Sequence, residues 1–184
     1  MGLRTLLGLK KQKILAYLNE SYSQEGEDSI LHRLFENEPL GYFVDVGAHH
    51  PIKYSNTYKF YKRGWRGLNI DAMPGSMDAF KLLRPEDVNL EMPVSDEEKE
   101  MPFFIFNEPA LNTFSWECAK ESDGRDHYKI ERIANIKTNR LDNILDLFLP
   151  PGQNINFLTV DAEGYDHKIL LSNNWAKYRP RSYY

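Results

Sequence analysis

The stretch of sequence that decides the fold is Tyr42–His50, which reads YFVDVGAHH. Its first five residues form a nearly continuous apolar run, as expected of a short strand buried on both faces of a parallel sheet. Gly47 begins a turn after this run. A helical pattern that includes Phe60 follows, with Ser55 as its expected N-cap and Gly64 at its end. Residues 42–64 therefore predict a strand, a tight turn and a helix in succession.

The alternation of strand and helix continues along the chain. Further strands are expected at 67–71 and 88–90, with a helix opened by a Pro-Gly pair between them, and a later strand is expected at 156–161. Helices are expected at 141–148 and around Ile169. This order implies right-handed crossovers and a parallel sheet, so we predict an α/β fold.

The alternation breaks in the middle of the chain. Apolar runs at 103–106 and 130–136 predict two strands, which form either an antiparallel pair or an extension of the sheet edge. A polar loop at 112–115 separates them, and Phe114 and Trp116 lie in or beside this loop. The two aromatic residues either stack on a sugar or pack against the rest of the protein.

The N-terminal residues 1–21 are predicted to form a helix separate from a domain that spans 22–184. Apolar residues recur at helical spacing over 3–19, with lysine and arginine between them. Such a helix either covers the domain or lies on a membrane surface, and the first arrangement is the usual one for an amphipathic helix. A further helix that contains Ile30 follows, with Ser23 as its expected N-cap.

Length and composition narrow the class of protein. The chain has 184 residues with 23 Lys+Arg and 27 Asp+Glu, hence a formal net charge of −4, which does not favour nucleic acid as a partner. Its single cysteine, Cys118, cannot form an intramolecular disulfide and fits a reducing compartment, so we expect a cytoplasmic protein. We expect no secretory signal, because the basic N-terminal segment lacks a small-residue cleavage site.

Three of the expected parallel strands carry an aspartate at or near their carboxyl ends: Asp45, Asp71 and Asp161. Ligands of open α/β sheets bind beyond these ends, at the point where the strand order reverses. If the first and last of the strands flank that point, the three acids share one cleft. Asp71 follows Asp45 by 26 residues, near the spacing expected for a carboxylate that binds ribose hydroxyls. The alternative is that each aspartate only caps the turn after its strand.

The glycine pattern after the first strand distinguishes two kinds of cofactor. A dinucleotide-binding turn has the pattern G-x-G-x-x-G, which lets the backbone approach a pyrophosphate. Here only Gly47 is present, and His49, His50 and Pro51 occupy the crowded positions. A nicotinamide oxidoreductase is therefore disfavoured, whereas a nucleoside without phosphates fits.

Six short motifs occur in a characteristic order: YSQEGED at 22–28, DVGAHHP at 45–51, SNT at 55–57, GWRG at 64–67, NIDAMP at 69–74 and DAEGYD at 161–166. This ordered set resembles the FkbM-type group of class I S-adenosylmethionine-dependent methyltransferases. No single motif is decisive, but their order is specific, and the resemblance extends over about 22–171.

The resemblance implies a Rossmann-like three-layer sandwich with a mostly parallel sheet and antiparallel additions. It also implies S-adenosylmethionine as the cofactor and methyl transfer to a hydroxyl oxygen, often on a sugar or polyketide. Class I methyltransferases usually continue after their last such helix with a further strand and an antiparallel pair. Here 172–184 leave room for at most one short strand, so we expect the C-terminal part of the sheet to be truncated. A homodimer that covers the exposed sheet edge is one expected arrangement.

The resemblance also assigns residues to the cofactor site. Asp45 and Gly47 would line its methionine part, and Asp71 would hold the ribose. The residues that would surround the adenine are Ala72, Met73 and Pro93. The remaining assigned residues would close the site from the N-terminal side or face the transferred methyl group and the acceptor, and they are Gln24, Asp28, Asn56, Asp161 and Glu163.

An alcohol acceptor must lose its proton as the new bond forms, so we expect a general base within hydrogen-bond reach of it. Asp161 and Glu163 are the first candidates. His50, together with His49, comes next, because the ordinary pKa of histidine near 6.5 suits a base at neutral pH, although both residues also fit a purely structural role in a turn. No histidine pair at i, i+4 and no cysteine cluster supports a metal site, so we expect no required metal.

Two functions from different classes follow from these patterns. The leading one is an S-adenosylmethionine-dependent O-methyltransferase that acts on a hydroxyl of a sugar, polysaccharide or related natural product, as in polysaccharide biosynthesis. The alternative is a non-catalytic cofactor-binding or scaffold protein that retains a methyltransferase-like fold, as the short C-terminal part suggests. Turnover of an acceptor distinguishes the first from the second.

Overall fold

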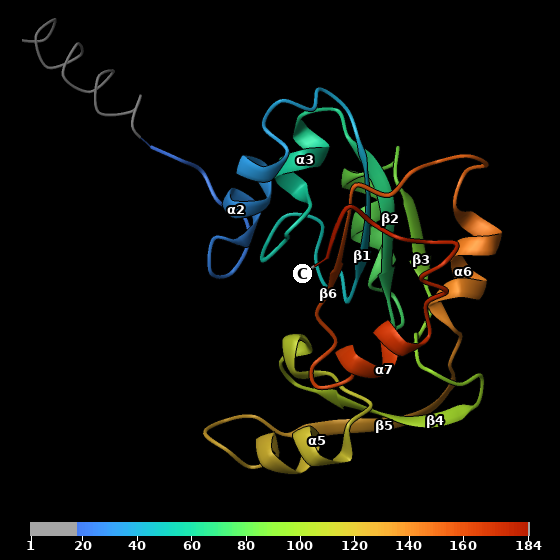
Figure 1. The fold of residues 1–184 in the computed structure, drawn as a ribbon. Helices are drawn as coiled ribbons and strands as arrows, with labels where there is room; N and C mark the ends of the chain where they lie inside the picture. The colour runs from blue at the N-terminus through green and yellow to red at the C-terminus, as the bar shows by residue number, and fades with distance from the viewer. Residues whose placement is uncertain (1–17, 184) are drawn as a thin grey trace, which may run out of the picture.

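The centre of the fold is a five-stranded parallel sheet with the strand order β3-β2-β1-β6-β7 (Figure 1). The computed structural model describes residues 18–183 of the chain. The strands of this sheet are β1 (Tyr42–Val46), β2 (Arg66–Asp71), β3 (Val88–Glu91), β6 (Phe157–Val160) and β7 (Ser182–Tyr183). The parallel sheet predicted from the apolar runs is therefore present.

Strand β1 lies in the middle of the sheet, and every one of its five residues is buried. It pairs with β2 on one side and with β6 on the other, with Phe43 opposite Phe157 and Val46 opposite Val160. The chain builds the sheet outward from β1 to β3 and then returns to the other side of β1. The strand order thus reverses between β1 and β6, as the cleft hypothesis requires, and this is where open α/β sheets bind ligands.

Helices cover both faces of the sheet and complete the predicted three layers (Figure 1). One face packs against α2 (Glu27–Leu34), α3 (Tyr58–Lys62) and α4 (Met77–Leu83), and the other against α6 (Leu141–Phe148) and α7 (Asp166–Leu171). On the first face, Phe60 of α3 meets Phe43 and Phe157 of the sheet. On the second, Ile144 of α6 lies in one cluster with Val44. The alternation of side chains along β1 therefore supplies both cores.

The two expected helix caps differ from those in the structure. The prediction of Ser55 as the N-cap is wrong, because the N-cap of α3 is Thr57; Oγ of Ser55 still accepts a hydrogen bond from the backbone N–H of Tyr58, the first residue of the helix, at 3.1 Å. The prediction for Ser23 is also wrong, because α2 begins after Gly26, which has a φ of 93°. Ser23 still accepts from the N–H of Asp28 at 3.2 Å, but from the loop before the helix.

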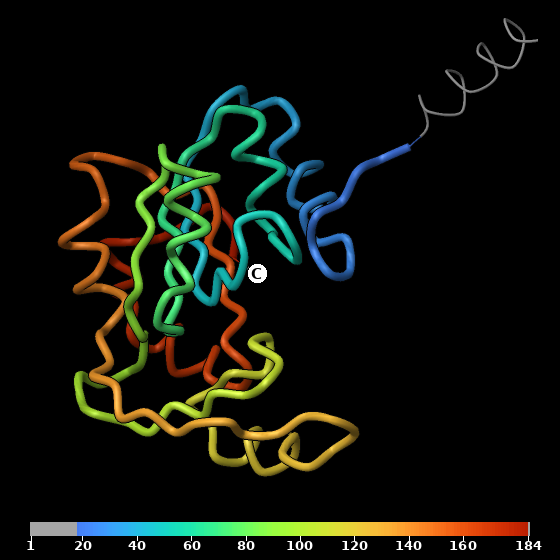
Figure 2. The backbone as a smooth tube through the Cα atoms, turned by 180° about the vertical axis from the view of Figure 1, so that it is seen from behind, coloured from blue at the N-terminus to red at the C-terminus, as the bar shows by residue number. Residues whose placement is uncertain are grey.

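The middle of the chain forms a separate unit, which we call the insert and define as residues 100–137. Strands β4 (Glu100–Phe106) and β5 (Ile130–Lys137) form their own two-stranded antiparallel sheet, so they are a pair and not an extension of the main sheet. Between them lie the short 3-10 helix η1 (Pro109–Leu111) and the helix α5 (Trp116–Ser122). The expectation of a loop at Trp116 is therefore wrong. Figures 1 and 2 show the insert lying across one end of the parallel sheet, beside α7.

The N-terminal helix predicted over 1–21 falls mostly outside the described residues. Within the described part, residues 18–21 are not helical. No helix among residues 18–183 has the length and apolar character needed to cross a membrane. At the other end, β7 has two residues and pairs in parallel with β6.

Candidate active site

A cavity of about 440 Å³ lies at the carboxyl ends of β1, β2 and β6, between the sheet and the insert. This volume is in the range of small-molecule binding sites. One wall is formed by residues that follow the strands, such as Gly47, Asp71 and Asp161. The opposite wall comes from the insert and includes Phe103, a residue that the sequence analysis did not assign to the site. The cavity thus occupies the strand-order reversal point.

Gly47 allows the two central strands to meet at the floor of this cavity. Its φ is +85°, a conformation that glycine adopts easily, and a Cβ there would lie 1.7 Å from the backbone oxygen of Asp161. The N–H of Asp161 in turn donates to the carbonyl of Val46 at 2.9 Å. A side chain at position 47 would therefore push the β1 turn away from the β6 turn.

Asp71, assigned above to the ribose, lies on the cavity wall with its carboxylate held by the backbone. Oδ1 accepts from the N–H of Met73 at 2.8 Å and Oδ2 accepts from the N–H of His49 at 2.9 Å. Burial raises the pKa of this carboxyl, and the two N–H groups act in the opposite direction. A carboxylate oxygen has two lone pairs, so each oxygen retains acceptor capacity for a ligand hydroxyl.

Apolar side chains surround the cavity next to Asp71. Ala72 and Met73, assigned above to the adenine, line it, and Met92 and Val94 line it from the strand β3 side. Pro93 itself is buried between these two and does not line the cavity, and its carbonyl accepts from the N–H of Asn139 at 2.8 Å. This part of the wall suits a flat apolar ring.

Asp161 and Glu163 lie on the other side of Gly47 and both line the cavity. We call residues 161–166, which contain them, the acid loop. Burial raises the pKa of Asp161, and the neighbouring carboxylates of Asp166 and Glu27 raise it further. Burial also raises the pKa of Glu163, followed by the charges of Asp161 and Asp166. The loop therefore gathers negative charge beside the cavity.

A second, smaller cavity of about 260 Å³ adjoins the first. Gln24, Tyr54 and Asp161 line both cavities, so the two meet at these side chains. Asn56 lines only the smaller one, and its Nδ2 donates to Oγ1 of Thr159 on β6 at 3.0 Å. Gln24 and Asn56, the two amide side chains assigned to the site, thus lie on its N-terminal side.

Asp28 does not line either cavity, although it was assigned to the cofactor site. Its side chain is fully buried within the loop before α2. There it accepts hydrogen bonds from the hydroxyls of Ser21 at 2.7 Å and Ser29 at 3.1 Å and from the N–H of Tyr22 at 2.8 Å. Asp28 holds the shape of the segment that presents Gln24.

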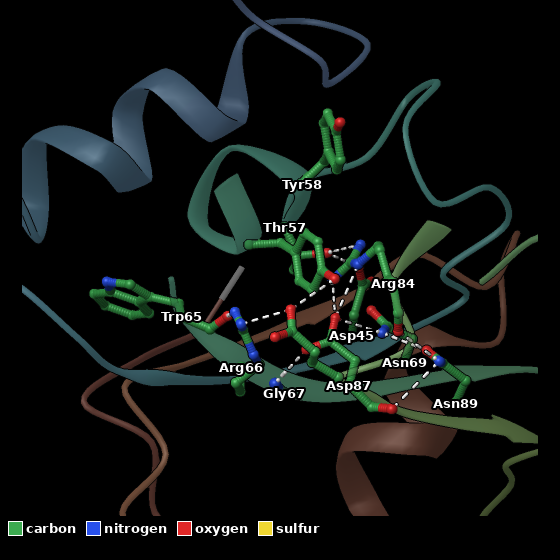
Figure 3. Close-up of polar contacts among 12 residues, drawn as sticks. Asp45, Thr57, Tyr58, Trp65, Arg66, Gly67, Asn69, Arg84, Asp87 and Asn89 are labelled. Atoms are coloured by element: carbon green, nitrogen blue, oxygen red, sulfur yellow. Dashed lines mark hydrogen bonds and ion pairs between the residues drawn. The ribbon is translucent and has the colours of Figure 1, made fainter. Parts of the chain in front are cut away.

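Asp45 also lies outside both cavities, on the face of the sheet that α3 and α4 cover. Figure 3 shows its side chain beside Thr57 and Arg84. Its Oδ2 accepts from Oγ1 of Thr57 at 2.7 Å, and Thr57 accepts from Nη1 of Arg84 at 3.0 Å. Arg84 is fully buried and pairs with Asp87, with 2.8 Å between Nη2 and Oδ2. We call Asp45, Thr57, Arg84 and Asp87 the buried arginine network. Burial raises the pKa of Asp45 from 3.8 to about 6 despite this cation.

The two histidines after Gly47 line the larger cavity. His49 has a φ of 52°, unusual for a residue with a side chain, and its ring stacks on Tyr54 with 6.4 Å between centroids. Nδ1 of His50 accepts from the N–H groups of Ile52 at 3.1 Å and Lys53 at 3.0 Å. Burial, followed by His49 and Lys53, lowers the pKa of His50, so the neutral ring carries its proton on Nε2.

The aromatic residues of the insert separate into two roles. Phe114 lines the cavity and lies between Phe103, at 4.6 Å between centroids, and Tyr165, at 5.6 Å. Trp116 is 57% exposed, does not line the cavity and packs on Phe104. Thr113 and Tyr165 also line the cavity. Their positions depend on the contact between the insert and the acid loop, which no local pattern predicts.

The described residues offer little to a metal ion. Between Leu18 and Tyr183, no group of three or more histidine, cysteine, aspartate or glutamate side chains is arranged to hold one. The site is instead an apolar cavity bordered by carboxylates.

Comparison with known proteins places the chain in a family. No curated protein and no solved structure matches the chain. A family model described as the methyltransferase FkbM domain matches residues 45–183, which include the last two residues of β1, the insert, the acid loop and most of the cavity wall. The chain therefore belongs to the FkbM methyltransferase family.

Proposed function

We propose that the protein transfers a methyl group from S-adenosylmethionine to a hydroxyl oxygen of a sugar, polysaccharide or related natural product. One observation carries this proposal: a single cavity has Asp71 and the pair Asp161 and Glu163 on either side of the β1 turn at Gly47. A carboxylate for ribose and carboxylates beside the reacting group are thereby available in one space.

The residues of the cavity fit a nucleoside that carries a positive charge. Asp71 would accept hydrogen bonds from the ribose hydroxyls, and the apolar wall with Met73 and Val94 would pack against the base. Gly47 would let the backbone approach the cofactor closely. When bound, the cofactor supplies a methyl group on a positively charged sulfur, and the negative charge of Asp161 and Glu163 suits such a cation.

Asp161 and Glu163 are the residues that we propose to accept the proton of the acceptor hydroxyl. Burial raises the pKa of both carboxyl groups, and a raised pKa makes a carboxylate a better base at neutral pH. His50 suits this role less well. Because its Nδ1 already accepts two backbone N–H groups, its Nε2 carries a proton and donates.

Titration calorimetry with S-adenosylhomocysteine tests the cofactor part of the proposal. We expect the wild-type protein to bind it and Asp71→Asn to bind it about 10- to 100-fold more weakly, since a hydrogen bond to a charged group contributes about 1.5–3 kcal/mol. Asp78→Asn is the matched control, because Asp78 lies on the exposed surface of α4. Folded wild-type protein that does not bind the compound would overturn the proposal.

Mass spectrometry of methyl transfer tests the acceptor part. A panel of neutral glycosides and hydroxylated natural products is incubated with S-adenosylmethionine, and we expect a mass increase of one methyl group whose rate Glu163→Gln or Asp161→Asn lowers strongly. Tight binding of S-adenosylhomocysteine without transfer to any member of a broad panel would favour the non-catalytic alternative.

A further inference from the structure

The insert contacts the acid loop through a short, partly buried hydrogen bond, in addition to a longer one from the Tyr165 hydroxyl to Sδ of Met101 at 3.7 Å. Oγ1 of Thr113 donates to the backbone oxygen of Glu163 at 2.7 Å. The same hydroxyl accepts from the N–H of Ser115 at 2.8 Å. Because the N–H occupies one side of the oxygen, the hydroxyl proton is directed to the carbonyl of Glu163.

Thr113 is itself held firmly. It is 2% exposed, and its backbone forms a bridge to β4 in which its N–H donates to the carbonyl of Phe104 at 3.2 Å and its carbonyl accepts from the N–H of Phe104 at 2.9 Å. The hydroxyl therefore projects from a fixed point of the insert toward the acid loop.

The acid loop has a backbone that needs such support. Glu163 has a φ of 46°, in the left-handed region that a residue with a side chain adopts at a cost, and Gly164 follows with a φ of 83°. Conformations of this kind persist where the surrounding structure determines them. The insert also contacts Gly164 closely, because a Cβ there would lie 2.5 Å from Sγ of Cys118 on α5.

We infer that Thr113 is a positioning residue that holds the carbonyl of Glu163 and thereby sets the direction of the Glu163 carboxylate in the cavity. The inference rests on the role proposed above for Glu163. It gives the insert a second task besides forming a wall: the insert fixes the backbone from which the proposed base projects. Thr113 also lines the cavity, but its hydroxyl is occupied by the N–H of Ser115 and the carbonyl of Glu163, so it acts through Glu163.

Four variants separate positioning from general stability. Thr113→Val removes the hydroxyl at nearly constant shape, and Thr113→Ser keeps it. Thr138→Val is the matched control, since Thr138 is also fully buried next to the insert and its Oγ1 also donates to a backbone oxygen, that of Glu97 at 2.6 Å, away from the acid loop. Glu163→Gln removes the charge of the proposed base.

Hydrogen exchange of the full-length protein measures whether the loop is held. Two amides report on it: Ala162 N–H donates to Asp166 at 2.8 Å and Tyr165 N–H donates to the carbonyl of Ala162 at 3.1 Å. We expect exchange in the peptide over 161–166 to rise about tenfold in Thr113→Val, which corresponds to about 1.4 kcal/mol, and to stay near wild type in Thr113→Ser. Thr138→Val should leave this peptide unchanged. Unchanged exchange in Thr113→Val, or an equal rise in Thr138→Val, would overturn the inference.

Titration of the Glu163 carboxyl by NMR adds a readout that a purely structural role would not move. In the wild type we expect a pKa above the ordinary 4.5, because the carboxyl loses part of its solvent in the cavity and lies near the charges of Asp161 and Asp166. Thr113→Val should return it toward 4.5, and Thr113→Ser should restore the wild-type value. If the pKa does not respond to Thr113→Val, Thr113 does not position Glu163.

The outcomes distinguish this inference from the proposed function. Exchange and NMR titration need no acceptor, so they decide the role of Thr113 even if S-adenosylhomocysteine does not bind. Where an acceptor is turned over, we expect Thr113→Val to lower kcat about tenfold with little change in KM for the cofactor. It should add no further loss in the Glu163→Gln background, because the two residues act as one unit.

Discussion

Two groups of acids lie on opposite sides of the β1 end: the first, Asp45 and Asp87, is buried, whereas the second, Asp161 and Glu163, is exposed to the cavity. In the buried arginine network, Asp45 and Asp87 share Arg84, whose guanidinium also lies over the rings of Phe43 and Phe80. In the acid loop, Asp161 and Glu163 border a cavity that no lysine or arginine of the described chain lines. Burial raises the pKa in both groups. The protein itself thus supplies a cation to the first group, whereas it supplies none to the second at the cavity wall.

Removing the cation of the buried arginine network should have the largest effect on the free energy of unfolding. Arg84→Met leaves Asp87 and Asp45 buried without a positive charge, and we expect the free energy of unfolding to fall by about 3–5 kcal/mol, measured by urea denaturation. Lys81→Met is the control, because the Lys81–Asp78 pair is exposed and should contribute less than about 1 kcal/mol. Similar small losses in both variants would mean that Arg84 does not neutralise the network.

The raised pKa of Asp45 should make the free energy of unfolding depend on pH. Its folded pKa of about 6 exceeds the ordinary 3.8, so between these values the folded protein binds more protons than the unfolded chain. The free energy of unfolding should therefore fall as pH rises through this range, and the distance from 3.8 to about 6 corresponds to about 3 kcal/mol.

Asp45→Asn tests this prediction, because the amide oxygen can still accept from Thr57 but the side chain no longer titrates. We expect the difference in unfolding free energy between wild type and variant to shrink from pH 4 to about pH 6 and to level off above it, measured by urea denaturation at each pH. A difference that stays constant with pH would show that Asp45 keeps an ordinary pKa in the folded state.

Gly47 offers the most specific test, on the cavity side, and the one with the smallest expected difference between variant and control. Gly47→Ala and Gly152→Ala both place a side chain at positive φ, at a cost of about 1–2 kcal/mol each. Only at position 47 does the new Cβ meet another atom, the oxygen of Asp161, so Gly47→Ala should cost about 1–3 kcal/mol more. It should also weaken S-adenosylhomocysteine binding, which calorimetry measures, while Gly152→Ala should not. Equal effects of the two variants would contradict the close approach of the β1 and β6 turns.

The strands of the main sheet could be predicted because each is a short apolar run, as β1 is. Helix α5 could not, because its sequence WECAKES has no apolar stripe. It is held by tertiary contacts, chiefly Ala119 against Phe104 and Phe106, and by Ser115 at its N-cap. Local composition does not contain this information.

The site was predicted where a residue follows directly from a strand end, and less well elsewhere. Gly47, Asp71 and Asp161 line the cavity because the carboxyl ends of neighbouring parallel strands meet there. Asp45 precedes Val46 in β1, so the two side chains lie on opposite faces of the sheet. The hydrogen bond from Thr57 and the nearby charge of Arg84 place Asp45 on the face away from the cavity. Those contacts join residues far apart in the sequence, which spacing alone does not disclose.

The pairing of β1 with β6 also has a consequence for the order of events in folding. Phe43 lies opposite Phe157, so the central pair of the sheet closes a loop of more than one hundred residues. Contacts this distant in sequence form slowly, and a nascent chain has no complete cavity until β6 has been synthesised. A ligand of the cavity therefore cannot guide the early steps of folding. It stabilises only the molecule in which β6 has already taken its place beside β1.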